Sequence, residues 1–332
     1  MLGAVKRAVD AEPRPGRFIL TGSVRTEITT NSWPGTGRVI RCPVFPMTVR
    51  EVLGHADRNS GLIERFYSGD VTSFSGATPA LDINDYVNLA VRGGFPDAVL
   101  NRDATASALW FGNYADEITH RDAELVRQGI DSNRFAAYLD AIASLTAGVV
   151  DDATILEAVR IDRRTANAYW MVLQNLFIAQ AIPAWWSSHL TRLVGTEKKY
   201  LIDSGLAAAI LGLTPDAVVR DSNWIGRLLD TFVVAQIRPE AALSLQRPKL
   251  HHLRTKADRH ELDLVLEFND GAVAGIEIKA TSAPDISDAK HLRWFRDELG
   301  ERFRMGVIFH TGPYDFQLDD RIIAAPISSL WA

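Results

Sequence analysis

Residues 261–280 read ELDLVLEF-NDG-AVAGIEIKA, and they predict a β-hairpin with an unusual charge pattern. Both halves alternate between apolar and polar side chains, which is typical of strands, and Asn-Asp-Gly between them is a strong turn signal. If the loop is those three residues, Asp263 lies directly opposite Glu277. Lys279 then lies on the same face of the hairpin, two residues further along.

Two carboxylates that face each other repel and are disfavoured in a plain sheet. A bound divalent cation removes that penalty, and carboxylate oxygens suit magnesium, which also coordinates phosphate oxygens. Lys279 would position or help to deprotonate an attacking water, or stabilise negative charge on the phosphate. The pattern therefore predicts a magnesium-dependent phosphodiester-cleaving site with Asp263, Glu277 and Lys279 as catalytic residues. The alternative is a solvated hairpin face of mixed charges.

The composition is that of a globular protein of about two domains. The chain has 332 residues, of which 47% are hydrophobic and 23% charged, and no run of about 18 apolar residues predicts a membrane span. The first twenty residues are unlike a secretory signal, and one cysteine, Cys42, excludes an internal disulfide. We therefore expect a cytoplasmic protein with Cys42 buried. A net charge of −5 means that any DNA contact must come from a local basic patch.

Other segments give a coarse order of elements. An apolar run at 17–21, stopped by Gly22, predicts a short buried strand. Helical patterns follow at 84–129 and 133–181, where apolar side chains at helical spacing indicate a winged-helix unit. After residue 200 the pattern is α/β. Its expected elements, besides the hairpin, are helices at 224–238 and 287–299 and a strand at 304–310.

Asp263 followed by Glu277-Ile278-Lys279 resembles the core of the PD-(D/E)xK nuclease superfamily. The surrounding sequence is similar to one branch, the family called domain of unknown function 4143, which usually follows an AAA-type ATP-binding domain. The matching pieces, besides the hairpin, are RFILTGS at 17–23, GRV at 37–39, GGFP at 93–96, KYLIDSGL at 199–206 and GRLLDTFV at 226–233.

The resemblance implies that Thr21, with Ser23 close by, is what remains of a γ-phosphate sensor. The sequence contains no Gly-Lys dipeptide, so the phosphate-binding loop G-x-x-x-x-G-K-[ST] is absent and ATP is not expected as a cofactor. We expect an N-terminally truncated member of the family. Either the gene model starts too late, or the first part was lost, or another chain supplies it.

The same resemblance implies a third carboxylate on the helix at 224–238. Relatives usually carry a glutamate there, and Asp230 stands at that position in this chain. One methylene less shortens its reach. The expected magnesium ligands are therefore Asp230, Asp263 and Glu277.

Two groups of basic residues are candidates for DNA contact. Arg163 and Arg164 begin the last helix of the winged-helix unit and would meet phosphates, although a solvated face of a protein-binding domain is an equal alternative. A second cluster lies next to the predicted site. It consists of Arg247, Lys249, Arg254, Lys256 and Arg259. His251, His252 and His260 in this stretch lack metal-ligand spacing and are expected to be loop residues.

The predicted organisation has four parts. They are an ATPase remnant at 1–54, a helical linker region at 55–130, a winged-helix-like domain at 131–205 and a nuclease-like α/β domain at 206–332. The leading hypothesis is a DNA-associated, nuclease-like protein that does not bind ATP alone and is not a membrane protein. The alternatives are a non-catalytic binding or regulatory module and an ATP-binding protein whose gene model lacks its N-terminus. A homo-oligomer or a protein partner is compatible with each of these hypotheses.

Overall fold

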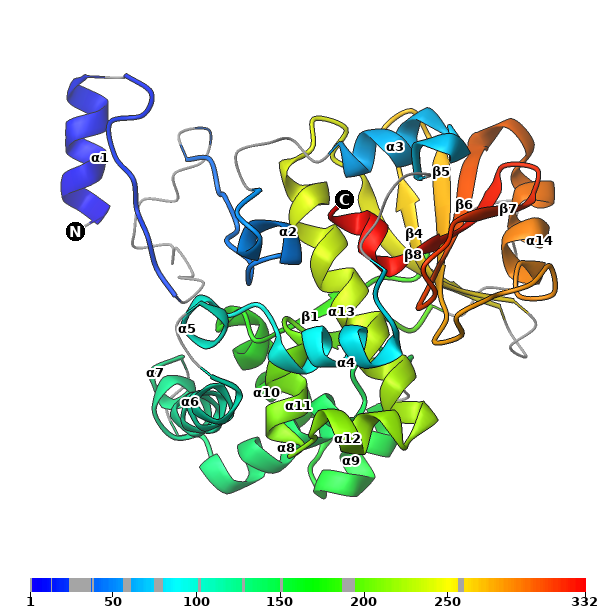
Figure 1. The fold of residues 1–332 in the computed structure, drawn as a ribbon. Helices are drawn as coiled ribbons and strands as arrows, with labels where there is room; N and C mark the ends of the chain where they lie inside the picture. Colours follow the sequence, from blue (N-terminus) through cyan, green and yellow to red (C-terminus); the bar gives the residue numbers. More distant parts are fainter. Residues whose placement is uncertain are drawn as a thin grey trace.

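The computed structural model describes residues 2–12, 14–23, 37, 39–55, 61–74, 80–100, 103–126, 129–149, 152–186, 195–255 and 260–332. It shows a mixed α/β protein in which a sheet lies beside a group of helices (Figure 1). The α/β class predicted from the sequence is confirmed.

The larger sheet has six strands in the order β3-β4-β5-β6-β8-β7. They are β3 (Lys249–Arg254), β4 (Glu261–Glu267), β5 (Val273–Ile278), β6 (Phe303–His310), β7 (Phe316–Asp319) and β8 (Ile322–Pro326). The neighbouring pairs β5–β6 and β6–β8 are parallel, and the outer pairs are antiparallel.

The predicted hairpin is formed by β4 and β5. Leu264 pairs with Ile276, and the register continued by one residue sets Asp263 opposite Glu277. Gly271 closes the loop with φ of +80°, a conformation that glycine adopts without strain. The hairpin and its register are therefore confirmed.

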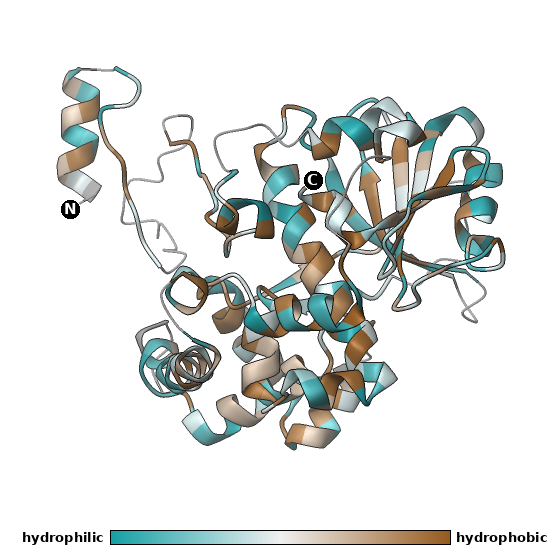
Figure 2. Cartoon of the chain, viewed as in Figure 1, coloured by the Kyte–Doolittle hydropathy of each residue, from teal (hydrophilic) through white to brown (hydrophobic). Residues whose placement is uncertain are grey.

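Helices cover both faces of this sheet. One face packs against α13 (Ser222–Leu243) and α3 (Leu62–Ser68), and the other packs against α14 (Lys290–Leu299). In Figure 2 the strands are largely brown, whereas the outward sides of α3 and α14 are largely teal. Burial of apolar side chains on both faces fixes the sheet between the helices.

The remaining helices form a group beside α13 (Figure 1). They are α4 (Ile83–Arg92), α5 (Pro96–Val99), α6 (Ala104–Glu117), a π-helical turn (Ile118–Asp122), α7 (Ala123–Val126), α8 (Ser132–Ser144), α9 (Asp152–Val159), α10 (Arg163–Asn175), α11 (Ser204–Ile210) and α12 (Pro215–Val219). Short 3₁₀ helices lie at Val71–Phe74, Gly300–Arg302 and Ile327–Leu330. Among the described helices, none combines the length and apolar character that a membrane crossing needs.

A small two-stranded ribbon connects the helices to the sheet. Strand β1 (Ala179–Ile182) directly follows α10 and pairs antiparallel with β2 (Lys198–Leu201). Beyond β1, the backbone N–H of Trp185 donates to His252 of β3 over 2.6 Å. Three helices, α8 to α10, thus precede the ribbon, and the winged-helix assignment of this part stays a prediction.

The N-terminal part departs from the predicted pattern. It begins with α1 (Leu2–Ala11), but residues 17–21 form no strand, and Ile19 is 89% exposed. No described strand lies beside this run to satisfy its backbone, so its apolar side chains do not become buried. Cys42, which was expected to be buried, is exposed as well and lies in the irregular segment before α2 (Val49–Val52). The predictions of a strand at 17–21 and of a buried Cys42 are therefore wrong.

The helical linker region predicted at 55–130 begins with a helix that packs on the sheet. Leu62, Ile63 and Phe66 of α3 are buried against the sheet core. The surrounding Gly and Ser residues suggest a loop, yet three apolar side chains on one side of a short helix are enough to dock it.

Two of the motifs that carried the family resemblance meet in a tight structural joint. The carboxylate of Asp203 accepts hydrogen bonds from Gly94 N (2.7 Å) and from Leu206 N (2.8 Å), at the start of α11. A Cβ at Gly205 would lie 2.8 Å from Cα of Gly93, so the two backbones touch. This close approach leaves no room for a side chain at Gly93 or at Gly205.

We expect Gly94→Ala to destabilise the protein by about 1–3 kcal/mol, because the new methyl group would collide with the Met47 carbonyl oxygen. Gly112→Ala is the matched control, since Gly112 lies in α6 with no atom near the added Cβ. That change should stabilise the helix by up to about 1 kcal/mol. Urea unfolding of both variants measures the difference, and equal stabilities would contradict the joint.

Candidate functional site

The three side chains of the predicted catalytic pattern converge at one end of the β4–β5 hairpin. The carboxylate of Asp263 accepts a hydrogen bond from the backbone N–H of Ile278 over 2.9 Å. Lys279 Nζ lies 2.8 Å from Glu277 Oε2, and Glu277 is only 2% exposed. The hairpin register thus brings all three groups to a common surface.

The fourth predicted member, Asp230, reaches the same place from the middle of α13. Its side chain is buried and accepts two hydrogen bonds, from Lys198 Nζ at 2.6 Å and from the Tyr200 hydroxyl at 2.9 Å. Both partners belong to strand β2 of the ribbon. Asp230 is therefore bound to the ribbon, and Lys198 in turn contacts Asp263 of the sheet.

The ammonium group of Lys198 stands between two of the predicted metal ligands. Its Nζ atom lies 2.6 Å from Asp230 Oδ2 and 3.1 Å from Asp263 Oδ1. Lys198 is 2% exposed, which is rare for a lysine and requires charged partners. We call Lys198, Asp230, Asp263, Glu277 and Lys279 the charged centre.

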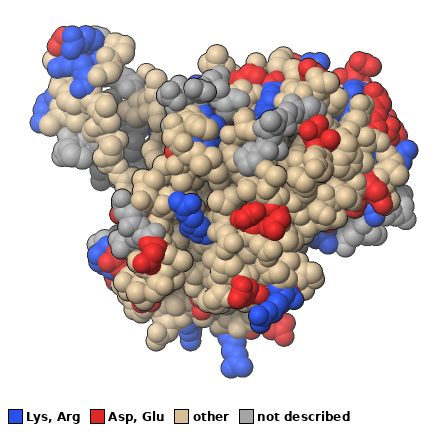
Figure 3. Space-filling model, in the orientation of Figure 1, with Lys and Arg blue, Asp and Glu red and all other residues tan. Residues whose placement is uncertain are grey.

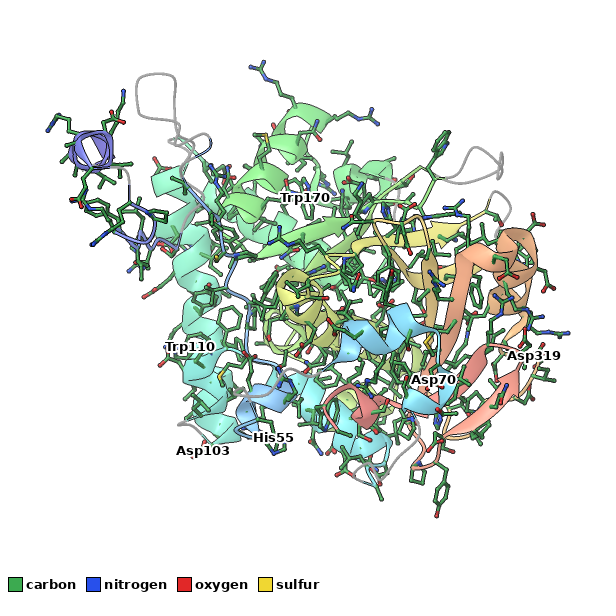
Figure 4. All side chains as sticks on the ribbon, turned by 90° about the horizontal axis from the view of Figure 1, so that it is seen from above. His55, Asp70, Asp103, Trp110, Trp170 and Asp319 are labelled. Atoms are coloured by element: carbon green, nitrogen blue, oxygen red, sulfur yellow. The ribbon has the colours of Figure 1, made fainter. Side chains whose placement is uncertain are left out.

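Strand alternation explains why Lys198 points inward. Lys198 and Tyr200 share one face of β2 and both contact Asp230. Lys199 lies on the opposite face, with Nζ 5.2 Å from the ring centre of Trp170. Trp170, labelled in Figure 4, belongs to α10. Two adjacent lysines thus have different environments.

The pKa values follow the balance between burial and charge. Burial alone would lower the pKa of Lys198, but the neighbouring carboxylates outweigh it and raise that pKa above its ordinary value. Burial would likewise raise the pKa of Asp263, yet Lys198, the Ile278 N–H and Lys279 together lower it. Lys198 is therefore charged at neutral pH, with an ionised Asp263 beside it.

Burial outweighs the neighbouring positive charge at two members of the charged centre. It raises the pKa of Asp230 to about 7 in spite of Lys198, and it raises the pKa of Glu277 to about 7 in spite of Lys279. Within the described part of the chain, the Oε1 atom of Glu277 is buried and has no hydrogen-bond partner. A buried carboxylate oxygen without a partner is uncommon and costs stability.

The residues present do not fit a resident divalent cation in this arrangement. Oxygen ligands of Asp230, Asp263 and Glu277 have the right chemistry for magnesium. However, two of the three carboxylates already bind the Lys198 ammonium, and among the described residues no group of three His, Cys, Asp or Glu side chains is placed to hold one metal ion. The carboxylates therefore have a lysine as their cation.

The basic cluster beside the site differs from its prediction. Lys249, His251, His252 and Arg254 lie in strand β3, so the loop predicted for the two histidines is wrong. A β-bulge between His251 and Leu253 breaks the alternation by which the strand would have been found. Arg247 and Lys249 are exposed, while Lys256 and Arg259 lie outside the described residues.

The other predicted binding residues lie away from the charged centre. Arg163 and Arg164 are exposed at the N-terminal end of α10, which is capped by Asp162. On the face shown in Figure 3, blue atoms gather at α1 and are otherwise mixed with red ones. Thr21 and Ser23, the predicted sensor remnant, are exposed in the irregular segment after α1.

Sequence reasoning missed Lys198 and Tyr200. The weak signal is a lysine two residues before Tyr200 and four before Ile202, which places all three on one face of an extended segment. The contact itself joins residues 32 and 65 positions apart, and no local pattern contains that information.

The raised pKa of Glu277 gives a testable pH dependence. The folded protein holds this proton more tightly than the unfolded chain, so stability is present below pH 4.5 and is lost as the pH rises to about 7. Relative to Glu277→Gln, the wild type should lose at most about 3 kcal/mol over that range. Urea unfolding at several pH values measures the difference.

Asp270→Asn, in the loop of the same hairpin, is the matched control. The Ala272 N–H holds the pKa of Asp270 below 3.8, so this difference should stay constant between pH 4.5 and 7. A constant difference for Glu277→Gln as well would contradict the buried, poorly compensated carboxyl.

Comparison with known proteins supports the coarse part of the resemblance. Residues 225–330 match the family model described as Domain of unknown function (DUF4143), which is typically found with AAA ATPase-like proteins. Residues 83–217 match a second model, Domain of unknown function (DUF8612). The first match covers the sheet, α14 and nearly all of α13. The second covers the helices from α4 to α11 and the ribbon.

Two curated relatives are similar over nearly the whole chain. An uncharacterized protein of Mycobacterium bovis and one of Mycobacterium tuberculosis are each 24% identical over 323 residues, which is 97% of this chain. The chain spans 64% of the length of these relatives. The presence of the predicted DUF4143 domain is thereby confirmed, with distant mycobacterial relatives.

Proposed function

We propose that this chain is a non-catalytic binding module built on a nuclease-like fold, with nucleic acid as its ligand. The observation that carries the proposal is the Lys198 ammonium held between Asp230 and Asp263. A metal-dependent nuclease needs those carboxylate oxygens for its cation. Here a side chain of the same polypeptide binds them.

The electrostatics of the charged centre support a structural role. Three carboxylates face two ammonium groups, and both ammonium groups are already in contact with carboxylates. A divalent ion placed beside Lys198 would be repelled by a cation only a few ångströms away in a buried environment, where screening is weak. The centre therefore favours joining the ribbon to the sheet over holding a metal ion.

The exposed arginines of α10 are the best candidates for ligand contact. Arg163 and Arg164 lie in its first turn, next to the Asp162 cap, and both side chains are exposed. Arg247 and Lys249 add exposed positive charge near β3. Contacts of this kind bind the phosphate backbone without reading its sequence. The proposal gives ATP no role in this chain.

Metal-dependent phosphodiester cleavage is the second candidate. It is favoured by the convergence of Asp263, Glu277 and Lys279 and by the partnerless Oε1 atom of Glu277. The two candidates differ in whether the carboxylates bind metal in the wild-type protein.

We expect the wild type to bind no magnesium or manganese through Glu277, because Lys198 already neutralises the adjacent carboxylates. Calorimetric titration of the wild type and Glu277→Ala with each metal should give the same heats. Plasmid and linear DNA incubated with wild type, Asp263→Ala and Glu277→Ala should show equal background cleavage. Cutting by the wild type that both substitutions abolish would establish the second candidate instead.

We further expect Arg163→Gln/Arg164→Gln to weaken binding to duplex DNA and to lower its salt dependence. Loss of two phosphate contacts should reduce the slope of log K against log salt by about 1.8. Fluorescence anisotropy at several salt concentrations measures both quantities. Arg220→Gln, an exposed arginine after α12, is the control and should change neither. An unchanged slope in the double variant would remove α10 from the interface.

A further inference from the structure

We propose that Trp186 is a stacking platform for an unpaired base, so that this chain binds single-stranded nucleic acid more tightly than duplex. The inference rests on the proposed function, which makes nucleic acid the ligand, and it names the form that is preferred. Trp186 is the most exposed tryptophan among the described residues, with 74% of its surface accessible to solvent.

The backbone beneath Trp186 is held against the edge of the larger sheet. The N–H of Trp185 donates to the His252 carbonyl over 2.6 Å, and the N–H of His252 donates to the Pro183 carbonyl over 3.1 Å. These two bonds set residues 183–185 parallel to β3, which is the first strand in the order of the sheet. The backbone that leads into Trp186 is therefore fixed to the sheet.

The neighbouring Trp185 determines the direction in which Trp186 points. The indole of Trp185 is 1% exposed and packs on Phe295 of α14, with the ring centres 5.2 Å apart. Side chains alternate along an extended segment, so Trp186 points to the side away from α14. A tryptophan side chain has few rotatable bonds, and a ligand that covers it loses little of the binding free energy to ordering.

The strand beside Trp186 supplies positive charge. Strand β3 reads KLHHLR and carries two positive side chains, Lys249 and Arg254, and no negative one. The parallel register of Ala184 with His252, continued by two residues, places Trp186 next to Arg254. Single-stranded nucleic acid binds to surfaces of this kind, because its bases stack on aromatic rings while its phosphates meet the neighbouring cations.

The preference for unpaired bases follows from the geometry of stacking. Within a duplex both faces of a base are covered by the adjacent base pairs, so an indole can stack only on a base that has left the duplex or lies at its end. A protein partner would instead require a contiguous apolar patch. Trp186 is one large ring that follows the small side chains of Pro183 and Ala184 and lies beside a basic strand.

The test compares Trp186→Ala with the wild type and with Tyr314→Ala in the full chain. Tyr314 is the matched control, because it is 77% exposed and lies after β6, away from β3 in the order of the sheet. Fluorescence anisotropy measures the binding of a labelled oligothymidylate and of a labelled duplex of the same length. We expect the wild type to prefer the single strand. Trp186→Ala should bind it about five- to 150-fold more weakly, which corresponds to the loss of one stacked base.

Duplex binding should be unchanged in Trp186→Ala, and Tyr314→Ala should change neither affinity. Trp186→Phe keeps an aromatic ring and should recover most of the single-strand binding. If Trp186→Ala binds the single strand as tightly as the wild type does, or weakens both ligands alike, the inference is overturned and the proposed function stands. If the wild type binds neither DNA, the proposed function is overturned and the inference with it.

Discussion

The contact between the Lys198 ammonium and the carboxylates of Asp230 and Asp263 connects three parts of the molecule. Lys198 belongs to the ribbon, Asp230 to α13 and Asp263 to the sheet. Burying an ion pair adds little net stability, because desolvation consumes most of the attraction. Leaving one partner alone is another matter and typically costs about 3–5 kcal/mol. The contact therefore acts mainly on specificity, since any arrangement that separates ribbon and sheet leaves an uncompensated buried charge.

Helix α13 makes that coupling geometric as well as electrostatic. Its apolar side chains pack on the sheet, while Asp230 and Thr231 face the ribbon and the turn after α8. Arg227 of the same helix donates to the carbonyl of Thr146. Helix α13 thus contacts both the ribbon and the sheet. The first matched family ends at residue 217 and the second begins at residue 225, close to the start of α13. One cluster of buried apolar side chains contains residues from both matched parts.

Sequence patterns predict these elements with uneven success, for physical reasons. The β4–β5 hairpin was predictable to the residue because alternation and an Asn-Asp-Gly turn are local and fix the register. Strand β3 was not, because its bulge at His251 breaks the alternation. The apolar run at 17–21 reads as a strand, but a strand needs a neighbour, and none of the described strands pairs with it. Asp230 entered the predicted site through family resemblance, and its side chain shares the Lys198 ammonium with Asp263. Lys198 was missed because its contacts exist only after the ribbon and the sheet have come together.

The missed residue changes what the site is able to do. Asp263, Glu277 and Lys279 alone describe a metal-dependent nuclease, and their convergence would satisfy that description. Lys198 favours the opposite interpretation, because the positive charge beside Asp230 and Asp263 is already supplied by a side chain of the same polypeptide. An internal cation cannot diffuse away, cannot be chelated and brings no Lewis acidity to a phosphate. What it does bring is a direct contact between the ribbon and the centre, since Lys198 enters from β2, whose next residue, Lys199, lies against Trp170 of α10.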